Sequence, residues 1–203
     1  MSELLDLGSM RDDLVAIRHD IHAHPETAFD ETRTSDLVAE RLGSFGLDVH
    51  RGLGGTGVVG TLKAGTSNNA IGLRADMDAL FIHEANDFSY RSTNDGKMHA
   101  CGHDGHTTML LGAARYLSEN PGFDGAVHFI FQPAEETGNE ECGGNRMVQD
   151  GLFDKFPVSA VYGMHNFPGV PLGQFAVRTG PMLASIDTFE LKVLSEHNHP
   201  ATQ

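Results

Sequence analysis

Apolar side chains recur at helical spacing in three segments of the chain, and each pattern predicts a helix with one face turned to a core. The first segment lies within residues 11–22, the second begins near residue 37, and the third covers residues 105–119. We expect the first two to be surface helices. The apolar positions are Leu14, Ile17 and Ile21, then Leu37, Val38, Leu42 and Phe45, then Met109, Leu110, Ala113 and Leu117.

Four short runs rich in β-branched and aromatic residues lie between and after these helices, and they predict buried strands. Strands that alternate with helices are typical of an α/β layer fold, so we expect a mixed sheet flanked by helices. The runs are GVVGTLK at 57–63, AIGLRAD at 70–76, AVHFIF at 126–131 and VSAVYGMH at 158–165.

The pattern changes near the C-terminal end of the sequence. TFELKVL at 188–194 alternates strictly between apolar and polar residues, which indicates a half-exposed strand rather than a buried one. We therefore expect one domain over residues 1–185 and the first strand of a second domain within residues 186–203.

The charge of the chain narrows the choice of partners. It has 14 basic and 28 acidic residues, a formal net charge of -14 at pH 7 and no run rich in Lys and Arg, which disfavours nucleic acid. The N-terminus has no basic segment followed by an apolar run, and no stretch is long and apolar enough to span a bilayer. We expect a cytoplasmic protein without a membrane or nucleic-acid partner.

The densest chemistry lies in HACGHDGH at 99–106, which holds one cysteine, three histidines and one aspartate. Thiolate, imidazole and carboxylate groups hold borderline metals such as zinc, manganese, cobalt or nickel. Cys101 and His103 are two residues apart, so both can face one metal centre, and Asp104 and His106 can support it. Because this segment directly precedes the third helix, we expect it in a loop or at the start of that helix.

Two other interpretations of this segment stay open. Cys101 can be a buried thiol beside histidines that cap the following helix, or it can be a nucleophile paired with a histidine. The second is disfavoured because a thiolate bound to a metal cannot attack a substrate, and no oxyanion loop is evident. The other cysteine, Cys142, is expected to be a small loop residue.

Further candidates fall at the carboxyl ends of predicted strands, where open α/β sheets place their ligand crevices. Glu135 and Glu136 follow one run and His165 ends another. Adjacent glutamates diverge, so one can bind a metal while the other acts as a general base; taken alone, they can also form an exposed acidic loop. Asp76 and Asp78 end a third run, and they can orient a ligand imidazole or cap a turn.

With these residues laid out, the chain resembles the M20 metallopeptidase family, in its amidohydrolase branch of hippurate hydrolases, N-acyl-amino-acid amidohydrolases and auxin-conjugate hydrolases. The resemblance is specific because several motifs match in order over nearly all of residues 10–190. The motifs are RHDIHAHPE at 18–26, GLRADMDAL at 72–80, MHACGHDGH at 98–106, QPAEE at 132–136 and GMHNFP at 163–168.

This resemblance implies a zinc-exopeptidase-like catalytic domain, a homodimer or higher oligomer, and hydrolysis of the amide bond of N-acyl amino acids by metal-activated water. Glu135 would be the general base and Asp76 a supporting residue. The metal site would hold two divalent ions (Zn, Mn, Ni or Co), and its ligands would be Cys101, His103, Glu136 and His165.

The chain also departs from that family. Members continue through a lid or dimerisation domain and back into the catalytic sheet, whereas this sequence ends LSEHNHPATQ at 194–203. We therefore expect a truncated or frameshifted product, or a fragment, whose missing strands would favour association. The alternative function is an inactive metal-binding or interaction fragment of such an enzyme.

Overall fold

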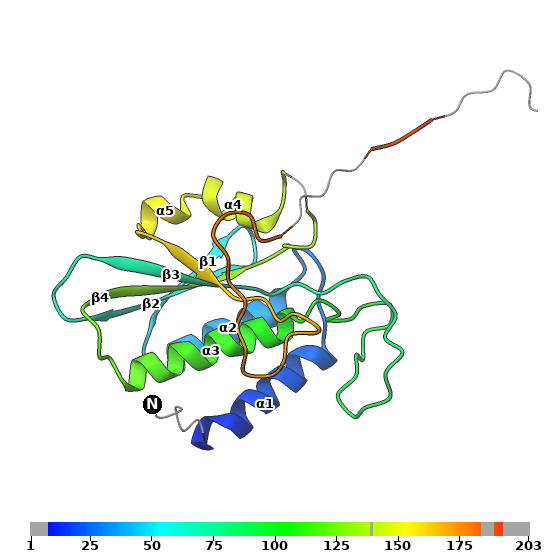
Figure 1. Cartoon of the computed structure of the whole chain (residues 1–203), viewed down its shortest axis with the longest axis horizontal. Helices are drawn as coiled ribbons and strands as arrows, with labels where there is room; N and C mark the ends of the chain where they lie inside the picture. Colours follow the sequence, from blue (N-terminus) through cyan, green and yellow to red (C-terminus); the bar gives the residue numbers. More distant parts are fainter. Residues whose placement is uncertain (1–7, 139, 184–188, 193–203) are drawn as a thin grey trace, which may run out of the picture. The chain divides into compact units, whose positions relative to one another are not determined.

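The computed structural model describes residues 8–138, 140–183 and 189–192. It contains both helices and strands, as the hydrophobic pattern predicts (Figure 1). They are α1 (Gly8–Ala23), α2 (Thr32–Ser44), β1 (Asp48–Leu53), β2 (Gly57–Ala64), β3 (Ala70–Asp76), α3 (His103–Glu119), β4 (Gly125–Gln132), α4 (Gly143–Gln149), α5 (Leu152–Lys155) and β5 (Val161–Gly163).

The five strands form one mixed sheet in the order β1-β2-β4-β3-β5. The pairs β1–β2 and β2–β4 are antiparallel, while β3 runs parallel to both β4 and β5. Helices α1, α2 and α3 lie on one side of the sheet and α4 and α5 on the other (Figure 1). This confirms the α/β fold with a mixed sheet flanked by helices.

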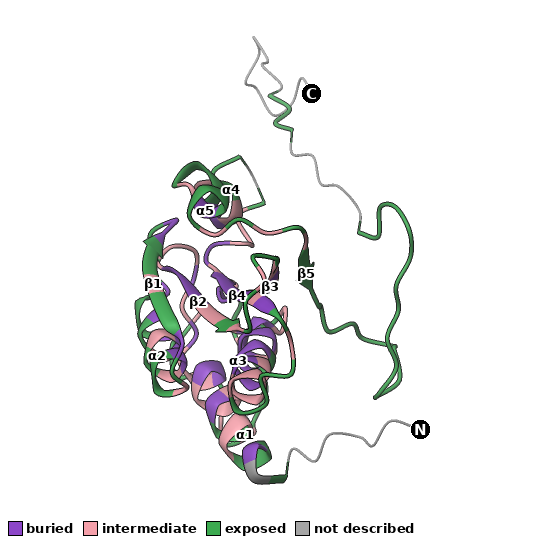
Figure 2. Cartoon of the chain, turned by 90° about the vertical axis from the view of Figure 1, so that its left-hand side faces the viewer, coloured by how far each residue is buried: buried purple, intermediate pink, exposed green. Residues whose placement is uncertain are grey.

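Strand β4 supplies the centre of the core because both of its faces are covered. Phe129 and Phe131 are fully buried in the cluster beneath α1, α2 and α3, whereas Ile130 packs with Met147 of α4 in a second cluster. Each such side chain contributes about 1.5–3 kcal/mol when it is fully buried. Figure 2 shows this buried centre and the exposed outer strands. The core therefore fixes the central strands whose ends carry the candidate site residues.

The predicted helices and the first three predicted strands are present. The strand predicted over 70–76 has its predicted bounds, and each of the others differs from its prediction at one or both ends. The fourth strand differs from its prediction, because β5 covers only three residues and all three are exposed. Its exposure has a simple cause: in the described part of the chain, β5 is an edge strand whose one partner is β3. The sequence patterns did not predict β1, α4 or α5.

The chain divides into two compact units, Met1–Phe167 and Pro168–Gln203. In the second unit, the described residues 168–183 and 189–192 are exposed and form neither helix nor strand. Residues 189–192 thus do not show the strand predicted over 188–194, whose other residues lie outside the described part, as do 193–203. The second domain expected from residue 186 stays a prediction. No helix among the described residues is long and apolar enough to cross a membrane.

Candidate metal centre

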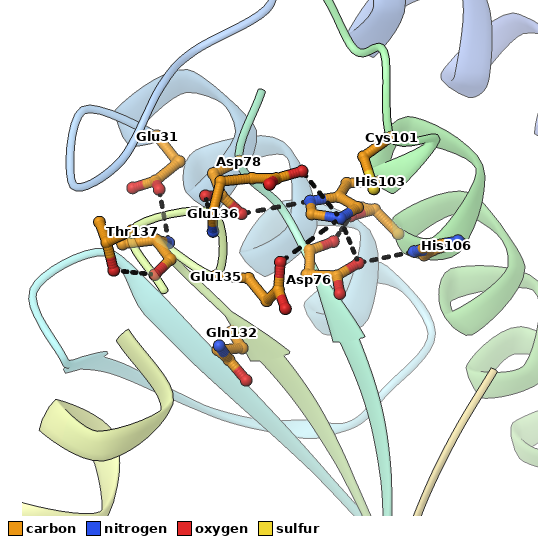
Figure 3. Close-up of polar contacts among 12 residues, drawn as sticks. Glu31, Asp76, Asp78, Cys101, His103, His106, Gln132, Glu135, Glu136 and Thr137 are labelled. Carbon is orange, nitrogen blue, oxygen red and sulfur yellow. Dashed lines mark hydrogen bonds and ion pairs between the residues drawn. The ribbon is translucent and has the colours of Figure 1, made fainter. Parts of the chain in front are cut away.

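The candidate site lies where β3 and β4 end, beside the first turn of α3 (Figure 3). Parallel strands end at the same edge of a sheet, so β3, β4 and β5 bring their following residues together there. Asp76 is the last residue of β3, Glu135 follows β4, and His165 follows β5. The topology thus explains why residues distant in the sequence meet at this edge.

His103 is the central residue of the site and is completely buried at the start of α3. Its Nδ1–H donates to Asp78 Oδ1 at 3.2 Å, which leaves Nε2 to face the site. Nε2 lies 3.6 Å from an oxygen of Asp76, 3.7 Å from Glu136 and 3.9 Å from Glu135. Burial lowers the pKa of His103, but the hydrogen bond to Asp78 and the nearby carboxylates outweigh it and raise the pKa overall.

Cys101 comes just before α3 and faces a second imidazole. Its Sγ lies 3.4 Å from Nε2 of His165. Burial, with the charges of Glu136 and Glu135, raises the pKa of the Cys101 thiol to about 12. A protonated thiol is a poor nucleophile, whereas a metal can displace its proton and bind the sulfur. This environment therefore favours a ligand over the cysteine nucleophile considered from the sequence.

The sequence predicts that the two adjacent glutamates diverge, but both side chains approach His103, and their donor atoms lie within 4.8 Å of each other. The Glu136 amide donates to Asp78 Oδ2 at 2.9 Å, and the Glu136 side chain is 22% exposed. The Glu135 side chain is 41% exposed. Burial and the charge of Asp76 raise the pKa of Glu135. These contacts disfavour the exposed acidic loop that the sequence left open.

The Asp76 carboxylate forms its hydrogen bonds with His106 and Arg74 and not with His103, the candidate ligand. His106 Nδ1–H donates to its Oδ1 and Arg74 to its Oδ2, each at 2.6 Å. Burial raises the pKa of Asp76, but these two neighbours lower it well below the ordinary range. Asp78, not Asp76, makes the hydrogen bond that orients His103, so the supporting aspartate nearest that imidazole is Asp78.

His106 links Asp76 to the loop that carries His165. The Asn166 amide donates to His106 Nε2 at 3.1 Å, and the Asn166 side chain contacts the same nitrogen. Asp104 points elsewhere, because its Oδ2 accepts from His22 at 2.8 Å and from Arg18 at 2.9 Å. Of the two supporting candidates in the cluster, only His106 therefore borders the site; Asp104 ties α3 to α1.

The donor set fits a metal ion. Among the residues that the structure describes, three groups of side chains hold their donor atoms within 4.8 Å of one another, and all three share His103. His103 Nε2 and Glu136 Oε1 are buried yet have no hydrogen-bond partner among the described residues. Unpaired buried polar atoms are costly, and a cation between them removes that cost. The groups are Cys101–His103–His165, His103–Glu135–Glu136 and Asp76–His103–His106.

The chain is similar to known proteins over most of its length. The model of peptidase family M20/M25/M40 matches residues 72–203. The chain is 47% identical over 197 residues to a hippurate hydrolase of Campylobacter jejuni, covering 97% of this chain and 50% of that protein. It is 40% identical to an N-acyl-L-amino acid amidohydrolase of Geobacillus stearothermophilus, covering 96% and 52%.

A solved structure agrees with these sequence matches. The YXEP protein of Bacillus subtilis, described as a dinuclear metal-binding peptidase of the M20 family, superposes with a TM-score of 0.80 at 36% identity. The match covers 85% of this chain and 48% of that one. The chain thus spans about half the length of the relatives it matches. From its motifs, its fold and these matches, the chain belongs to peptidase family M20/M25/M40.

Proposed function

We propose that the chain carries the two-metal centre of an amidohydrolase that cleaves the amide bond of N-acyl amino acids. The observation that carries this proposal is that Nε2 of His103 is buried near the carboxylates of Glu135 and Glu136 and has no hydrogen-bond partner among the described residues. The names of the relatives support the substrate class: one is a hippurate hydrolase, and another, 36% identical, is an N-acetyl-L-cysteine deacetylase of Bacillus subtilis.

The proposed metal ligands are Cys101, His103, Glu136 and His165, which together offer sulfur, nitrogen and oxygen donors. Such a mixed set suits zinc, manganese, cobalt or nickel. When bound, divalent ions of this kind polarise a substrate carbonyl and acidify water.

Glu135 is the proposed general base. Its side chain is more exposed than that of Glu136, so it can reach a substrate, and burial raises its pKa toward the neutral range in which proton transfer is efficient. Its carboxylate would accept a proton from the attacking water and deliver it to the departing amide nitrogen. Asp78 and Asp76 would hold His103 and His106 in place.

The test is the metal content of the purified 203-residue chain after equilibration with trace Zn²⁺ or Mn²⁺. We expect bound metal that Cys101→Ala removes in large part, while Cys142→Ala, the matched control on the other cysteine, retains it. A chain that holds no metal, or that loses it equally in both variants, would overturn the proposed centre.

Hydrolysis is tested separately with hippurate and N-acetyl amino acids. Glu135→Gln should retain the metal and lower the rate by about 10²–10⁴-fold, the usual contribution of a general base. Metal binding without any hydrolysis by the unmodified chain would support the alternative, a metal-binding fragment without catalytic activity.

A further inference from the structure

The carboxylate of Glu31 is completely buried and binds three separate segments. Its Oε1 accepts the backbone amides of Phe29 at 3.0 Å and of Ala134 at 2.8 Å, and its Oε2 accepts the hydroxyl of Thr56 at 2.6 Å. Phe29 precedes α2, Thr56 lies in the turn between β1 and β2, and Ala134 follows β4. One side chain thus connects the start of α2 to the loop that carries the two glutamates.

An ordinary capping role does not explain this arrangement. Glu31 occupies the N-cap position of α2, but its side chain makes no hydrogen bond to that helix. Glu26 does so instead, because its carboxylate accepts the amides of Arg33 at 3.0 Å and of Thr34 at 2.8 Å. The Glu31 carboxylate is therefore committed to contacts outside the helix that it precedes.

Two of the residues that bind Glu31 have an unusual backbone conformation. Within the described part of the chain, Phe29 (φ 64°) and Ala134 (φ 47°) are the two non-glycine residues with positive φ. Both donate their amide to the same oxygen, Glu31 Oε1. Residues with a Cβ rarely adopt this region, and they keep it only where surrounding contacts hold them there. Glu31 supplies such a contact to both.

Ala134 directly precedes Glu135 and Glu136, so its conformation sets the direction of both side chains. We propose that Glu31 is a positioning residue for the metal centre: by binding the Ala134 amide, it holds that residue in the left-handed region and aims both glutamates at His103. This inference rests on the proposed function, because it assumes that the two glutamates belong to a metal centre. Figure 3 shows Glu31 on the side of this loop away from His103.

Metal affinity of the 203-residue chain, titrated with Zn²⁺ or Mn²⁺, tests the inference. Glu31→Met removes the acceptor but keeps most of the volume, and it should weaken binding by about tenfold or more, as losses of supporting groups do. Glu31→Gln keeps an amide oxygen for both backbone donors and should bind close to wild type. Glu26→Ala, the matched control, should leave affinity unchanged.

A second change isolates the backbone. Glycine adopts positive φ without strain, so adding Ala134→Gly to Glu31→Met should recover much of the lost affinity. A merely structural role for Glu31 predicts no such recovery. Equal affinity in Glu31→Met and wild type overturns the inference. If Glu31→Met does not fold, a loss of about tenfold or more in Glu31→Gln overturns it as well.

Amide hydrogen exchange gives a readout that needs no metal. Glu31→Met should speed exchange in residues 133–137, whereas Glu26→Ala should speed it only at the start of α2. If the wild-type chain binds no metal, that result contradicts the proposed function but not the contact between Glu31 and Ala134. The positioning role is then tested by amide hydrogen exchange alone. Unchanged exchange in residues 133–137 of Glu31→Met overturns the positioning role.

Discussion

The two ring nitrogens of His103 have opposite environments. Nδ1–H donates to Asp78, while Nε2 is buried without a hydrogen-bond partner among the described residues. The second oxygen of Asp78 accepts the amide of Glu136. One carboxylate therefore fixes the tautomer of a proposed ligand and the backbone of another, which is the usual arrangement around metal-binding imidazoles.

This double contact leads to a prediction about Asp78. Asp78→Ala should weaken the affinity for Zn²⁺ or Mn²⁺ by about 10–100-fold, because the His103 ring and the Glu136 backbone both lose their acceptor. Asp78→Asn keeps one acceptor oxygen and should have a smaller effect. Competition titration against a chelating dye measures both.

Asp124 provides the matched control for Asp78. It also accepts two backbone amides, from Thr66 at 2.6 Å and Ser67 at 2.8 Å, but these lie in an exposed loop. Asp124→Ala should leave metal affinity unchanged. Equal affinity in Asp78→Ala and Asp124→Ala would contradict the role assigned to Asp78.

Residue types and strand ends were enough to find the candidate ligands, but not the residues that support them. Cys101 and His103 are close in the sequence, and Glu136 follows a recognisable strand, so their place could be predicted. Glu31 could not, because its bond to Ala134 joins residues 103 positions apart and no motif marks it. The choice between Asp76 and Asp78 likewise depends on where α3 begins relative to β3.

At the scale of elements, the sequence predicted the strands and helices whose side chains are well buried. β4 is covered on both faces and reads as a continuous apolar run, whereas β1 is a mostly exposed edge strand whose sequence DVHRGL has little apolar character. The short α4 begins with two glycines, which are poor helix formers, and it is stabilised by packing of Met147. Contacts distant in the sequence thus determine the elements that local patterns did not predict.

The N-terminus of α2 gives a prediction about stability alone. Glu26 accepts two amides of the first turn, so Glu26→Ala should lower the free energy of unfolding by about 0.5–2 kcal/mol, as loss of a capping side chain does. Urea denaturation measures the change. Glu40→Ala, an exposed position in the same helix, should have little effect, and a larger loss there would argue against the capping role.

His128 of β4 is expected to make the stability of the fold depend on pH. It is buried, its Nδ1 lies 2.9 Å from the Thr61 hydroxyl, and its ring lies 5.2 Å from that of Phe156. Burial, with the charge of Lys63, lowers the pKa of His128 in the folded chain. The unfolded chain, with a histidine pKa of about 6.5, then takes up a proton first as the pH falls.

Protonation of His128 should therefore have no effect on stability well above pH 6.5, and it should destabilise the fold progressively as the pH falls below that value. The free energy of unfolding, measured by urea denaturation between about pH 5 and 8, should decrease less at low pH in His128→Gln than in wild type. His50→Gln on β1 is the control. Parallel curves for wild type and His128→Gln would contradict the expectation.

At the scale of the whole molecule, the two edges of the sheet differ. β1 carries charged residues, including Asp48 and Arg51, whereas β5 is short and apolar and presents Tyr162 at 59% exposure, with Met164 following at 55%. Unpaired edge strands with apolar side chains are templates for association, and charge on an edge opposes it. We therefore expect copies of the chain to associate through the β5 edge and not through β1.

Sedimentation of the 203-residue chain at increasing concentration tests this expectation. The average mass should rise with concentration in wild type and in Val49→Lys on β1, and should rise much less in Tyr162→Lys. The net charge of -14 opposes contact between copies, so added salt should strengthen association by screening that repulsion. Association held by ion pairs would instead weaken with salt, and that result would exclude the apolar β5 edge as the contact. Equal association of the two lysine variants would exclude it as well.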